Sequence, residues 1–490
     1  MKPLGTISMY YPFLDSETQK TLNHIMEESQ TYRDFALTLG KRVCDDEATL
    51  RLAYLAAVHV WQLAELDMMD QIRTKYSDSA IVRPWTLHQR MPDNTGDRHV
   101  QVHEAIEEAV RTNPEDWILV QLPQASEGFL GPMTGFPKLI EDAGNLLKER
   151  PELECFKSGF HNLNCWIHAM EGDISKAVSE IGLGLEIARR YDDRHREMKL
   201  LTDLANLTKN TDVRSALVLL EDAYLLCTEL DSRYDKSVIL NEMGLVSTIL
   251  GEYDLALKCH LDSVRMEESE GSLGFFGTLN LSHAYLNLKD GLGALGWADS
   301  AMKQVEPDGT IWSHLTMARC LIALDSLEDA AHHLDTAKFM ALKSGYESVL
   351  GQYYYVQGLY EKAMGDAETA IQTLEQALDI YERHRILLYE VYCLLALSEA
   401  ELDTIKATHA DLDADSSGPW MTKLEKLAKD KDLPGILTLH ALLKADLQMM
   451  QDRKSAAIET LESALEFCDT SGVRTLREWV TVQIEEIYGT

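Results

Sequence analysis

The sequence predicts an all-α protein, a right-handed α-solenoid of stacked antiparallel helical hairpins. The first observation is an alanine that recurs every 36 to 40 residues, with one interval of about twice that length: Ala177, Ala216, Ala256, Ala294, Ala330, Ala370 and Ala457. The second is a small residue seven positions after each of these register alanines, on the same side of a helix: Gly184, Ala223, Ser263, Ala301, Ala337, Ala377 and Ala464. One such unit cannot bury its apolar face alone, so neighbouring units must stack.

A third set of residues marks the first helix of each hairpin. Small residues dominate the positions twelve residues before the register alanines, where only Leu204 is large: Cys165, Leu204, Gly244, Ser282, Ala318, Gly358 and Ala445. Small residues at matched points of two antiparallel helices let the two backbones approach closely. The spacing therefore predicts the interface inside each hairpin.

Turn residues separate the two predicted helices of a hairpin. Three turns combine glycine with an acid: Gly172-Asp173, Gly251-Glu252 and Gly365-Asp366. Glycine adopts the left-handed conformation that ends a helix, and the acid caps the helix that follows. Asp212, Asp290 and Ser326 are predicted to cap their helices without a preceding glycine.

At this spacing the chain resembles the tetratricopeptide repeat (TPR) family, which places a small residue in its first helix and two alanines in its second. Two units carry the resemblance best, namely Leu240 to Ala256 with its Gly-Glu-Tyr turn, and Tyr354 to Ala377. The units are longer than the roughly 34 residues of the family, and long helices are similar to those in helical regions of signal-responsive regulators. The resemblance covers residues 152–490 and implies a TPR-like superhelix.

The prediction divides the chain at residue 151. Residues 152–490 are expected to form the regular array, closed by a capping helix near 473–487. One unit of the array has a long turn, because residues 408–418 are inserted between a helix at 387–402 and a helix that opens at Trp420. Residues 1–151 are interpreted as a helical region of degenerate TPR-like repeats.

Within residues 1–151, Ser16 and Gln19 predict a capping box that opens a helix to about Val43. A second helix is expected from Glu47 to about Tyr76. The apolar segment Met9 to Leu14 is predicted to cover the end of the stack. Residues 122–137 are rich in glycine and proline and predict a hinge or boundary.

Composition limits the function. The chain has 46 Lys and Arg against 80 Asp and Glu, a net charge of -34, which disfavours nucleic acid and anionic membranes as partners. No apolar run is long enough to cross a membrane, and the start does not read as a secretory signal, so we expect a cytoplasmic protein. The eight cysteines are scattered without a C-x-x-C pair and are interpreted as small core residues.

No motif indicates catalysis, a cofactor or a metal, so we expect a protein that is not an enzyme. The acidic string Asp411, Asp413 and Asp415 lacks the glycine and the glutamate of a calcium loop, and a solvated acidic loop is the preferred interpretation. His99 and His103 have the spacing of a zinc pair, but no third ligand follows at a telling distance. The glycines 271, 274 and 277 are interpreted as a turn between helices.

The expected function is a non-catalytic scaffold that binds a protein or peptide in its concave groove. In the TPR family the first helix of each unit lines that groove, and by register the resemblance implies these contact residues: Asn162, Trp166, Asn241, His283, Trp312, Arg319, Tyr355 and Lys362. The family's peptide clamp of basic and asparagine residues is not reproduced. An alternative is a ligand-responsive regulatory subunit that acts in trans, without its own NTPase or DNA-binding module.

Overall fold

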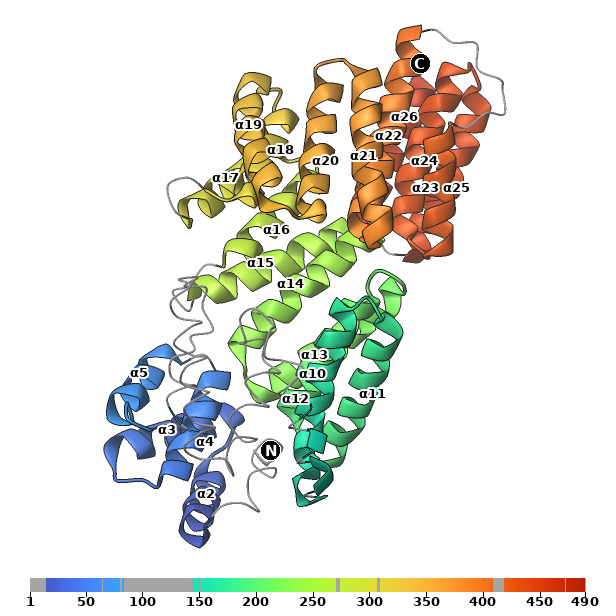
Figure 1. The fold of residues 1–490 in the computed structure, drawn as a ribbon. Coiled ribbons are helices and arrows are strands. Elements are labelled where there is room, and N and C mark those ends of the chain that lie inside the picture. Colours follow the sequence, from blue (N-terminus) through green and yellow to red (C-terminus); the bar gives the residue numbers. More distant parts are fainter. Residues whose placement is uncertain are drawn as a thin grey trace. The chain divides into compact units, whose positions relative to one another are not determined.

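The computed structural model describes residues 15–79 and 151–489, with gaps at 64, 270–273, 306–308, 409–417 and 472, and a few residues between 82 and 149. Every regular element in these residues is helical, so the predicted all-α class is confirmed (Figure 1). Four of the predicted features lie outside the described residues: the segment Met9 to Leu14, the pair His99 and His103, residues 122–137, and the acidic string at 411–415.

From residue 151 the chain forms a short 3-10 turn, η2 (Pro151–Phe156), eight consecutive helix pairs and one last helix, α26 (Arg474–Gly489). The pairs are α10 (Lys157–Met170) with α11 (Ile174–Arg190), α12 (Arg194–Thr208) with α13 (Val213–Leu230), α14 (Arg233–Leu250) with α15 (Tyr253–Ser269), α16 (Phe275–Asn287) with α17 (Gly291–Lys303), α18 (Ile311–Ala323) with α19 (Leu327–Ser344), α20 (Glu347–Ala363) with α21 (Ala367–His384), α22 (Leu387–Thr408) with α23 (Pro419–Asp430), and α24 (Pro434–Met450) with α25 (Lys454–Ser471). The predicted TPR-like hairpin architecture is therefore present.

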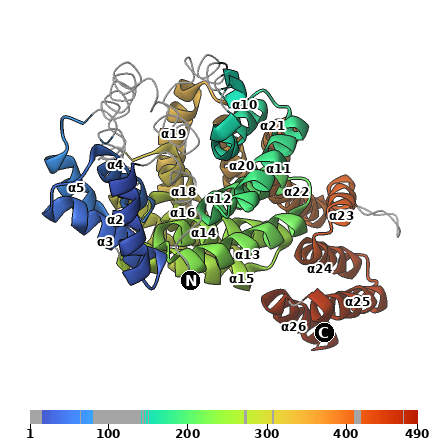
Figure 2. The ribbon, with the colours of Figure 1, turned by 90° about the horizontal axis from the view of Figure 1, so that it is seen from below.

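Two compact units make up the chain. The first contains Met1–Leu207 with Val218–Ile239, and the second contains Thr208–Leu217 with Leu240–Thr490. Within the second unit, the first helices of successive hairpins contact one another from α16 to α26, as Figures 1 and 2 also show. The predicted division of the chain at residue 151 separates irregular from regular repeats, not compact units, and it stays a prediction.

The register alanines lie where the two helices of a hairpin meet. Each of the seven exposes 1% or less of its surface, and the small residues seven positions later are buried as well. Leu204 is the one large residue among the positions twelve before the register alanines. It is half-buried, whereas its neighbour Ala205 exposes only 1%. In α12 the small residue that faces the core stands one position later than the sequence register predicts.

Two glycines of the first helices sit against large partners. A β-carbon on Gly358 would lie 2.6 Å from Leu374 Cγ and 3.3 Å from the carbonyl oxygen of Ala370, a register alanine. A β-carbon on Gly244 would lie 2.5 Å from the imidazole of His260. Glycine is required at these places because the opposite helix brings a side chain into the space that a β-carbon needs.

The predicted turns form as expected at the glycines. Gly172, Gly251 and Gly365 have φ between +78° and +83°, the left-handed conformation. Asp173 and Asp366 each accept a hydrogen bond from a backbone N–H three residues on, at 3.1 Å. Asp212 and Asp290 do the same. Ser326 also stands at the predicted capping position, the N-cap of α19, although its side chain forms no capping hydrogen bond.

The long helices expected near the N-terminus are each broken in two. The structure has α2 (Ser16–Glu28), α3 (Tyr32–Asp45), α4 (Leu50–Gln62) and α5 (Leu66–Lys75) in their place. The first break arises because Thr31 caps α3, accepting from the N–H of Asp34 at 3.0 Å. The capping box at Ser16 was also wrong, since Asp15 is the N-cap and accepts from the N–H of Thr18 at 2.8 Å.

Contacts between distant hairpins close the second unit on itself. The turn before α15 touches the start of α24, where a β-carbon on Gly251 would lie 2.6 Å from Gly435 Cα. Asp254 accepts hydrogen bonds from the backbone N–H and the hydroxyl of Thr475, at 2.9 and 2.6 Å. We call these contacts the seam. It joins the start of α15 and the turn before it to α24 and α26.

The inserted unit differs in one detail from the prediction. Its first helix, α22, continues to Thr408 rather than ending near residue 402, and α23 begins at Pro419, where proline suits the first helical turn. Residues 409–417 of the insertion lie outside the description. Seven of the eight cysteines are buried, and burial raises the pKa of the Cys165 thiol to about 12, as expected of a core residue.

Enlarging a register alanine should overpack its hairpin. We expect Ala370→Leu to lower the free energy of unfolding by about 1–3 kcal/mol, because the site is fully buried against the opposite helix. The matched control is Ala363→Leu in the same hairpin, at an exposed position, which should change stability little. Chemical denaturation of both variants measures the difference, and equal stability would contradict the assigned interface.

Stability should also fall in mild acid through His260. Burial lowers the pKa of this imidazole from 6.5 to about 4, so the unfolded chain binds the proton first as the pH falls through that window. The free energy of unfolding therefore decreases below about pH 6.5, by about 2 kcal/mol at pH 5 from this group. Denaturation curves of His260→Gln should show a weaker pH dependence, whereas exposed His24→Gln should keep the original one.

Candidate binding groove

A small pocket opens on the first helices of four successive hairpins in the second unit. It encloses about 200 Å³, and α16, α18, α20 and α22 line it. Its apolar walls come from these residues: Phe276, Leu279, Trp312, Leu315, Tyr355 and Val356. We call it the aromatic pocket. No residue of a second helix contributes to it, which fits a groove formed by the first helices.

Helical spacing brings the lining residues together. On α16 the lining residues recur at 276, 279 and 283, and on α18 they recur at 312, 315 and 319. Intervals of three and four residues place side chains on one face of a helix. The register alanines of the second helices bury the opposite side of each hairpin, so the lining positions are the ones left facing the groove.

Arg319 provides the one charged side chain of the lining. Its guanidinium carbon lies 5.5 Å from the ring centroids of both Tyr355 and Tyr392, within the range of cation–π attraction. The two rings are nearly parallel, at 12° and a centroid distance of 5.9 Å. Among the described residues, no carboxylate forms an ion pair with Arg319, and the largest electrostatic influences on its guanidinium come from tyrosines and Cys320.

Tyrosines below Arg319 are held by hydrogen bonds and stacking. The hydroxyl of Tyr392 accepts from the amide of Asn287 at 2.9 Å, and the hydroxyl of Tyr389 accepts from Gln352 Nε2 at 2.8 Å. Tyr389 also stacks on Tyr381 with centroids 4.8 Å apart. Burial raises the pKa of Tyr389 to about 12, so this phenol stays neutral and contributes no charge that would balance the guanidinium.

His283 is the remaining titratable group of the lining. Its Nε2 lies 3.0 Å from the hydroxyl of Thr316. Burial lowers its pKa well below 6.5, and the positive charge of Arg319 and the neighbouring His260 lower it further. The imidazole is therefore neutral at physiological pH, and Arg319 carries the only formal charge in the lining.

A second, larger pocket shares two of these helices, α20 and α22. It encloses about 640 Å³, and residues of α20, α22, α24 and α26 line it together with Lys289. Lys362 pairs with Glu399, and Lys289 Nζ lies 4.3 Å from the ring centroid of Trp479. Burial raises the pKa of Asp446. We call it the mixed-charge pocket. Residues of α20 and α22 line both pockets.

Four of the eight residues predicted to contact a partner line one pocket, and a fifth lines another. His283, Trp312, Arg319 and Tyr355 line the aromatic pocket, and Lys362 lines the mixed-charge pocket. Asn241 lies beside them, but its side-chain oxygen accepts from His260 at 3.0 Å and from Asn280 at 3.1 Å. This asparagine therefore holds two side chains in place, Asn280 of the first helix α16 and His260 of the second helix α15.

The other two predicted residues, Asn162 and Trp166, belong to α10 in the first unit. Asn162 exposes 1% of its surface, and its amide donates to Asp203 at 2.7 Å, so it is poorly placed to meet a partner. Trp166 is 39% exposed. The groove assignment therefore concentrates on α16 to α26.

Eight of the twelve residues that line the aromatic pocket escaped the sequence prediction, among them Phe276 and Tyr389. Tyr392, whose ring lies against Arg319, escaped it as well. The signal that was available is the spacing Tyr389-x-x-Tyr392, which puts two rings on one face of α22. This helix belongs to the unit with the inserted turn, where the register alanine is missing. Phe276 stands at the start of α16 and is 64% exposed, so register alone did not mark it as a lining residue.

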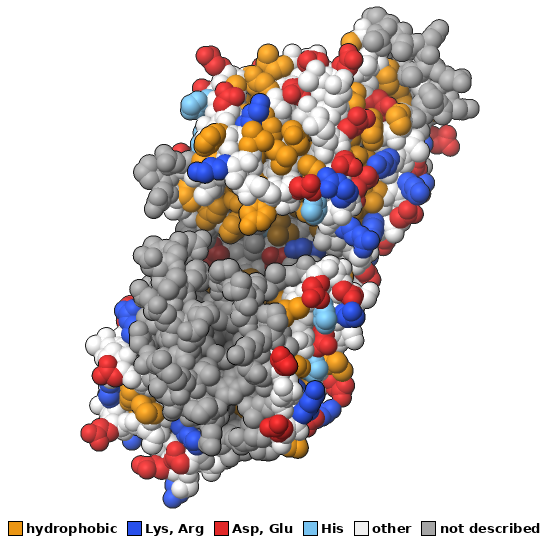
Figure 3. All heavy atoms as spheres, viewed as in Figure 1, with side chains coloured by type: hydrophobic (Ala, Val, Ile, Leu, Met, Phe, Trp, Pro, Cys, Tyr) orange, Lys and Arg blue, Asp and Glu red, His pale blue; other side chains and the backbone are white. Residues whose placement is uncertain are grey.

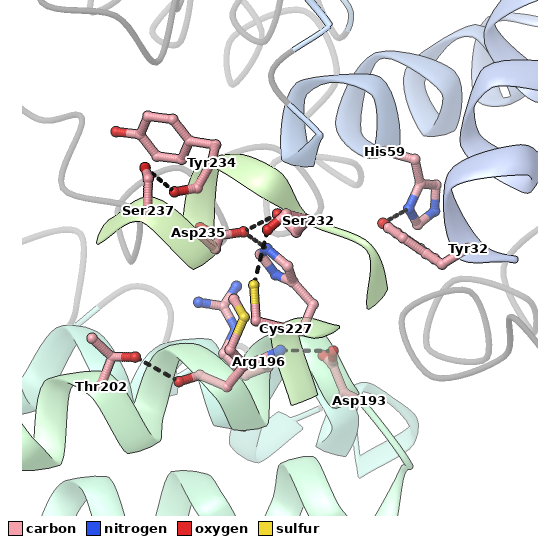
Figure 4. A network of polar contacts seen from close by, with 12 residues as sticks. Tyr32, His59, Asp193, Arg196, Thr202, Cys227, Ser232, Tyr234, Asp235 and Ser237 are labelled. Atoms are coloured by element: carbon pink, nitrogen blue, oxygen red, sulfur yellow. Dashed lines mark hydrogen bonds and ion pairs between the residues drawn. The ribbon is translucent and has the colours of Figure 1, made fainter. Parts of the chain in front are cut away.

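A polar cluster in the first unit resembles a catalytic arrangement in composition (Figure 4). The hydroxyl of Ser232 donates to Asp235 at 2.6 Å, and His195 Nε2 lies 3.5 Å from the same carboxylate. Cys227 Sγ lies 2.9 Å from the carbonyl of Ser232. All four side chains are buried, with 8% exposure at most, so a substrate cannot reach them. The cluster ties the turn between α13 and α14.

Outside the groove, hydrophobic side chains also appear on the surface. Figure 3 shows them among charged groups on the part of the second unit that carries α19 and α20. The most exposed include Phe339, Leu342 and Tyr346, at 64–70%. Exposed apolar residues are common on the surfaces of folded proteins. Across the described ranges, no helix combines the length and apolar composition that crossing a bilayer requires, and no group of three metal-ligating side chains is assembled.

Comparison with known proteins gives the following result. No protein-family model and no curated protein matches the sequence. Similar solved structures include a Rap protein complexed with competence and sporulation factor, at 14% identity and a TM-score of 0.39, covering 68% of this chain and 98% of that one. Another is apo RapI, at 12% identity and a TM-score of 0.37, covering 80% of this chain and 99% of that one.

A third is a signal-transduction ATPase with numerous domains and a tetratricopeptide repeat sensor, from Pyrococcus horikoshii. Its identity is 16% and its TM-score 0.45, and the match covers 78% of this chain but only 56% of that one. These scores are low, and the fold assignment stands on the helix pairs and buried register alanines of the chain itself. By its own fold the chain is a TPR-like helical-repeat protein.

Proposed function

We propose that the chain is a non-catalytic interaction scaffold that binds a peptide segment of a partner protein along the groove of α16 to α26. The observation that carries the proposal is the aromatic pocket, an apolar recess with a few polar groups on an otherwise repetitive surface. Rings and arginine are the residue types that supply most of the energy at protein interfaces.

The size of the pocket favours a peptide over a free small molecule. At about 200 Å³ it is smaller than the roughly 300–1,000 Å³ of pockets that enclose drug-sized ligands. It has room for one side chain or chain end. The rest of a peptide would continue over the mixed-charge pocket, where Lys362 and Glu399 offer both signs of charge.

The alternative function, a ligand-responsive regulator, draws support from the mixed-charge pocket. Its volume of about 640 Å³ lies within the range for small-molecule sites. Its lining carries three lysines and four acids, an environment that suits a zwitterionic or polar ligand.

Peptide selection tests the scaffold function. A displayed library of random short peptides should yield binders to the wild-type protein, and Trp312→Ala should weaken them by about 2 kcal/mol or more, because a ring anchor is removed from the pocket wall. Trp297→Ala is the matched control, since this tryptophan is also half-buried but lies on α17, a second helix. Affinities come from fluorescence anisotropy with labelled peptides.

Failure has a defined form in this experiment. A library that yields no saturable binder, or binders that tolerate Trp312→Ala as well as they tolerate Trp297→Ala, would contradict peptide binding in the groove.

Thermal shift separates the two functions. A metabolite library should leave the melting temperature unchanged if the chain is a peptide scaffold, whereas a compound bound to the folded state raises it without any protein partner. A compound that raises the melting temperature of the wild type but not of Lys406→Ala, which changes the mixed-charge pocket, would favour the regulator.

A further inference from the structure

We infer that the aromatic pocket recognises a carboxylate group of the bound peptide through Arg319, with an apolar or aromatic side chain of the same peptide beside it. The inference rests on the proposed function, because it assigns the chemistry of one subsite in that groove. It goes further by naming the group that the pocket accepts.

The first step is the state of Arg319 in the structure. Its guanidinium is half-buried beside two tyrosine rings, and no carboxylate of the described residues forms an ion pair with it. A cation removed from water needs an anionic or hydrogen-bonding partner to offset the lost hydration. Tyrosine rings offset part of this cost through cation–π attraction, but they leave the net positive charge unbalanced.

The hydrogen-bonding capacity of the guanidinium points the same way. Arginine has five N–H donors in a rigid planar fork. A carboxylate accepts two parallel N–H bonds from one guanidinium, and this bidentate geometry is the strongest that a single arginine offers.

The surrounding groups select a carboxylate over a phosphate. A phosphate group carries about -1.5 to -2 charges and is usually held by a cluster of arginines. The lining of this pocket has one cation, since the neighbouring His283 is neutral at physiological pH. One guanidinium balances one carboxylate.

The remaining walls explain the apolar neighbour. Trp312 and Leu315 face the pocket one to two turns before Arg319 on α18, and Val356 faces it from α20. The amide of Gln352 donates to Tyr389, and that of Asn280 donates to Asn241, so these two side chains are occupied by the protein itself. A residue with an apolar side chain next to its carboxylate fits this division of surfaces.

The overall charge of the chain makes the contribution of Arg319 easy to isolate. With a net charge of -34, the protein repels anions at long range, and the attraction is confined to the pocket. Salt of about 0.15 M limits such fields to about 8 Å. Loss of this one charge should therefore remove the preference for an acid completely.

Paired small probes provide the test. N-acetylphenylalanine carries a terminal carboxylate, and N-acetylphenylalaninamide differs only in lacking its charge. Ligand-detected NMR should show the acid binding the wild type roughly tenfold to a hundredfold more tightly than the amide. The ratio should fall to about one in Arg319→Gln and be partly kept in Arg319→Lys. Arg383→Gln, an exposed arginine paired with Glu347, is the matched control and should keep the full ratio.

A second pair of probes distinguishes the source of the carboxylate. Acetyl-Phe-Glu-amide carries its only carboxylate on a side chain, and acetyl-Phe-Gln-amide carries none. Preference for the Glu probe alone assigns the pocket to an internal acidic residue, and preference for N-acetylphenylalanine alone assigns it to a chain end. Either result supports the inference.

Three outcomes would overturn it. The first is that the acids and amides bind the wild type equally. The second is that the acid preference survives in Arg319→Gln while thermal melting shows that this variant is folded. The third is that acetyl-Phe-phosphoserine-amide outcompetes both carboxylates. If Arg319→Gln does not fold, the decision passes to Arg319→Lys and to the wild-type ratio at high salt, which must decrease. Failure of the proposed function differs, because selected peptides would then ignore Trp312→Ala whatever these ratios are.

Discussion

Close approach of the two helices in each hairpin is the constraint on which the structure depends. The register alanines and the small residues opposite them expose almost no surface, and Gly358 and Gly244 leave no room for a β-carbon. Because this contact fixes how each first helix lies against its second helix, it also fixes which face of the first helix remains uncovered. The groove follows from the packing inside the hairpins, before any partner is considered.

Residues at the interface inside each hairpin stabilise the fold, whereas residues on the uncovered face of the first helices form the candidate binding site. The aromatic pocket gathers side chains from residue 276 to residue 389, which no short sequence motif could display. Each hairpin contributes a few lining residues from its first helix, and the chemistry of the pocket arises from their combination. Arg319 is the only cation among the rings of this pocket. Carboxylates are abundant in this acidic chain, but none lines the aromatic pocket.

Much of the fold was predictable because periodic burial leaves a strong trace in sequence. The hairpins from α10 onward and the left-handed glycines followed from spacing. Four of the twelve lining residues of the aromatic pocket followed from the register of the family that the chain resembles. The misses have local causes. Thr31 and Asp15 cap helices at places where several neighbouring polar residues could serve as the cap, so the sequence did not single them out. In α12 the buried small residue is Ala205, one position after the predicted Leu204. Tyr389 and Tyr392 were missed because the register is interrupted in their unit.

The seam affects the order in which the parts of the second unit fold. In a linear array each repeat meets only its neighbours, and folding can begin anywhere and spread. Here Asp254 meets Thr475 across 221 residues. Closing so long a loop carries an entropic cost that must be met before the contact contributes, so hairpins form first and the seam joins last. Because α24 and α26 also line the mixed-charge pocket, their joining at the seam then decides when that pocket becomes complete.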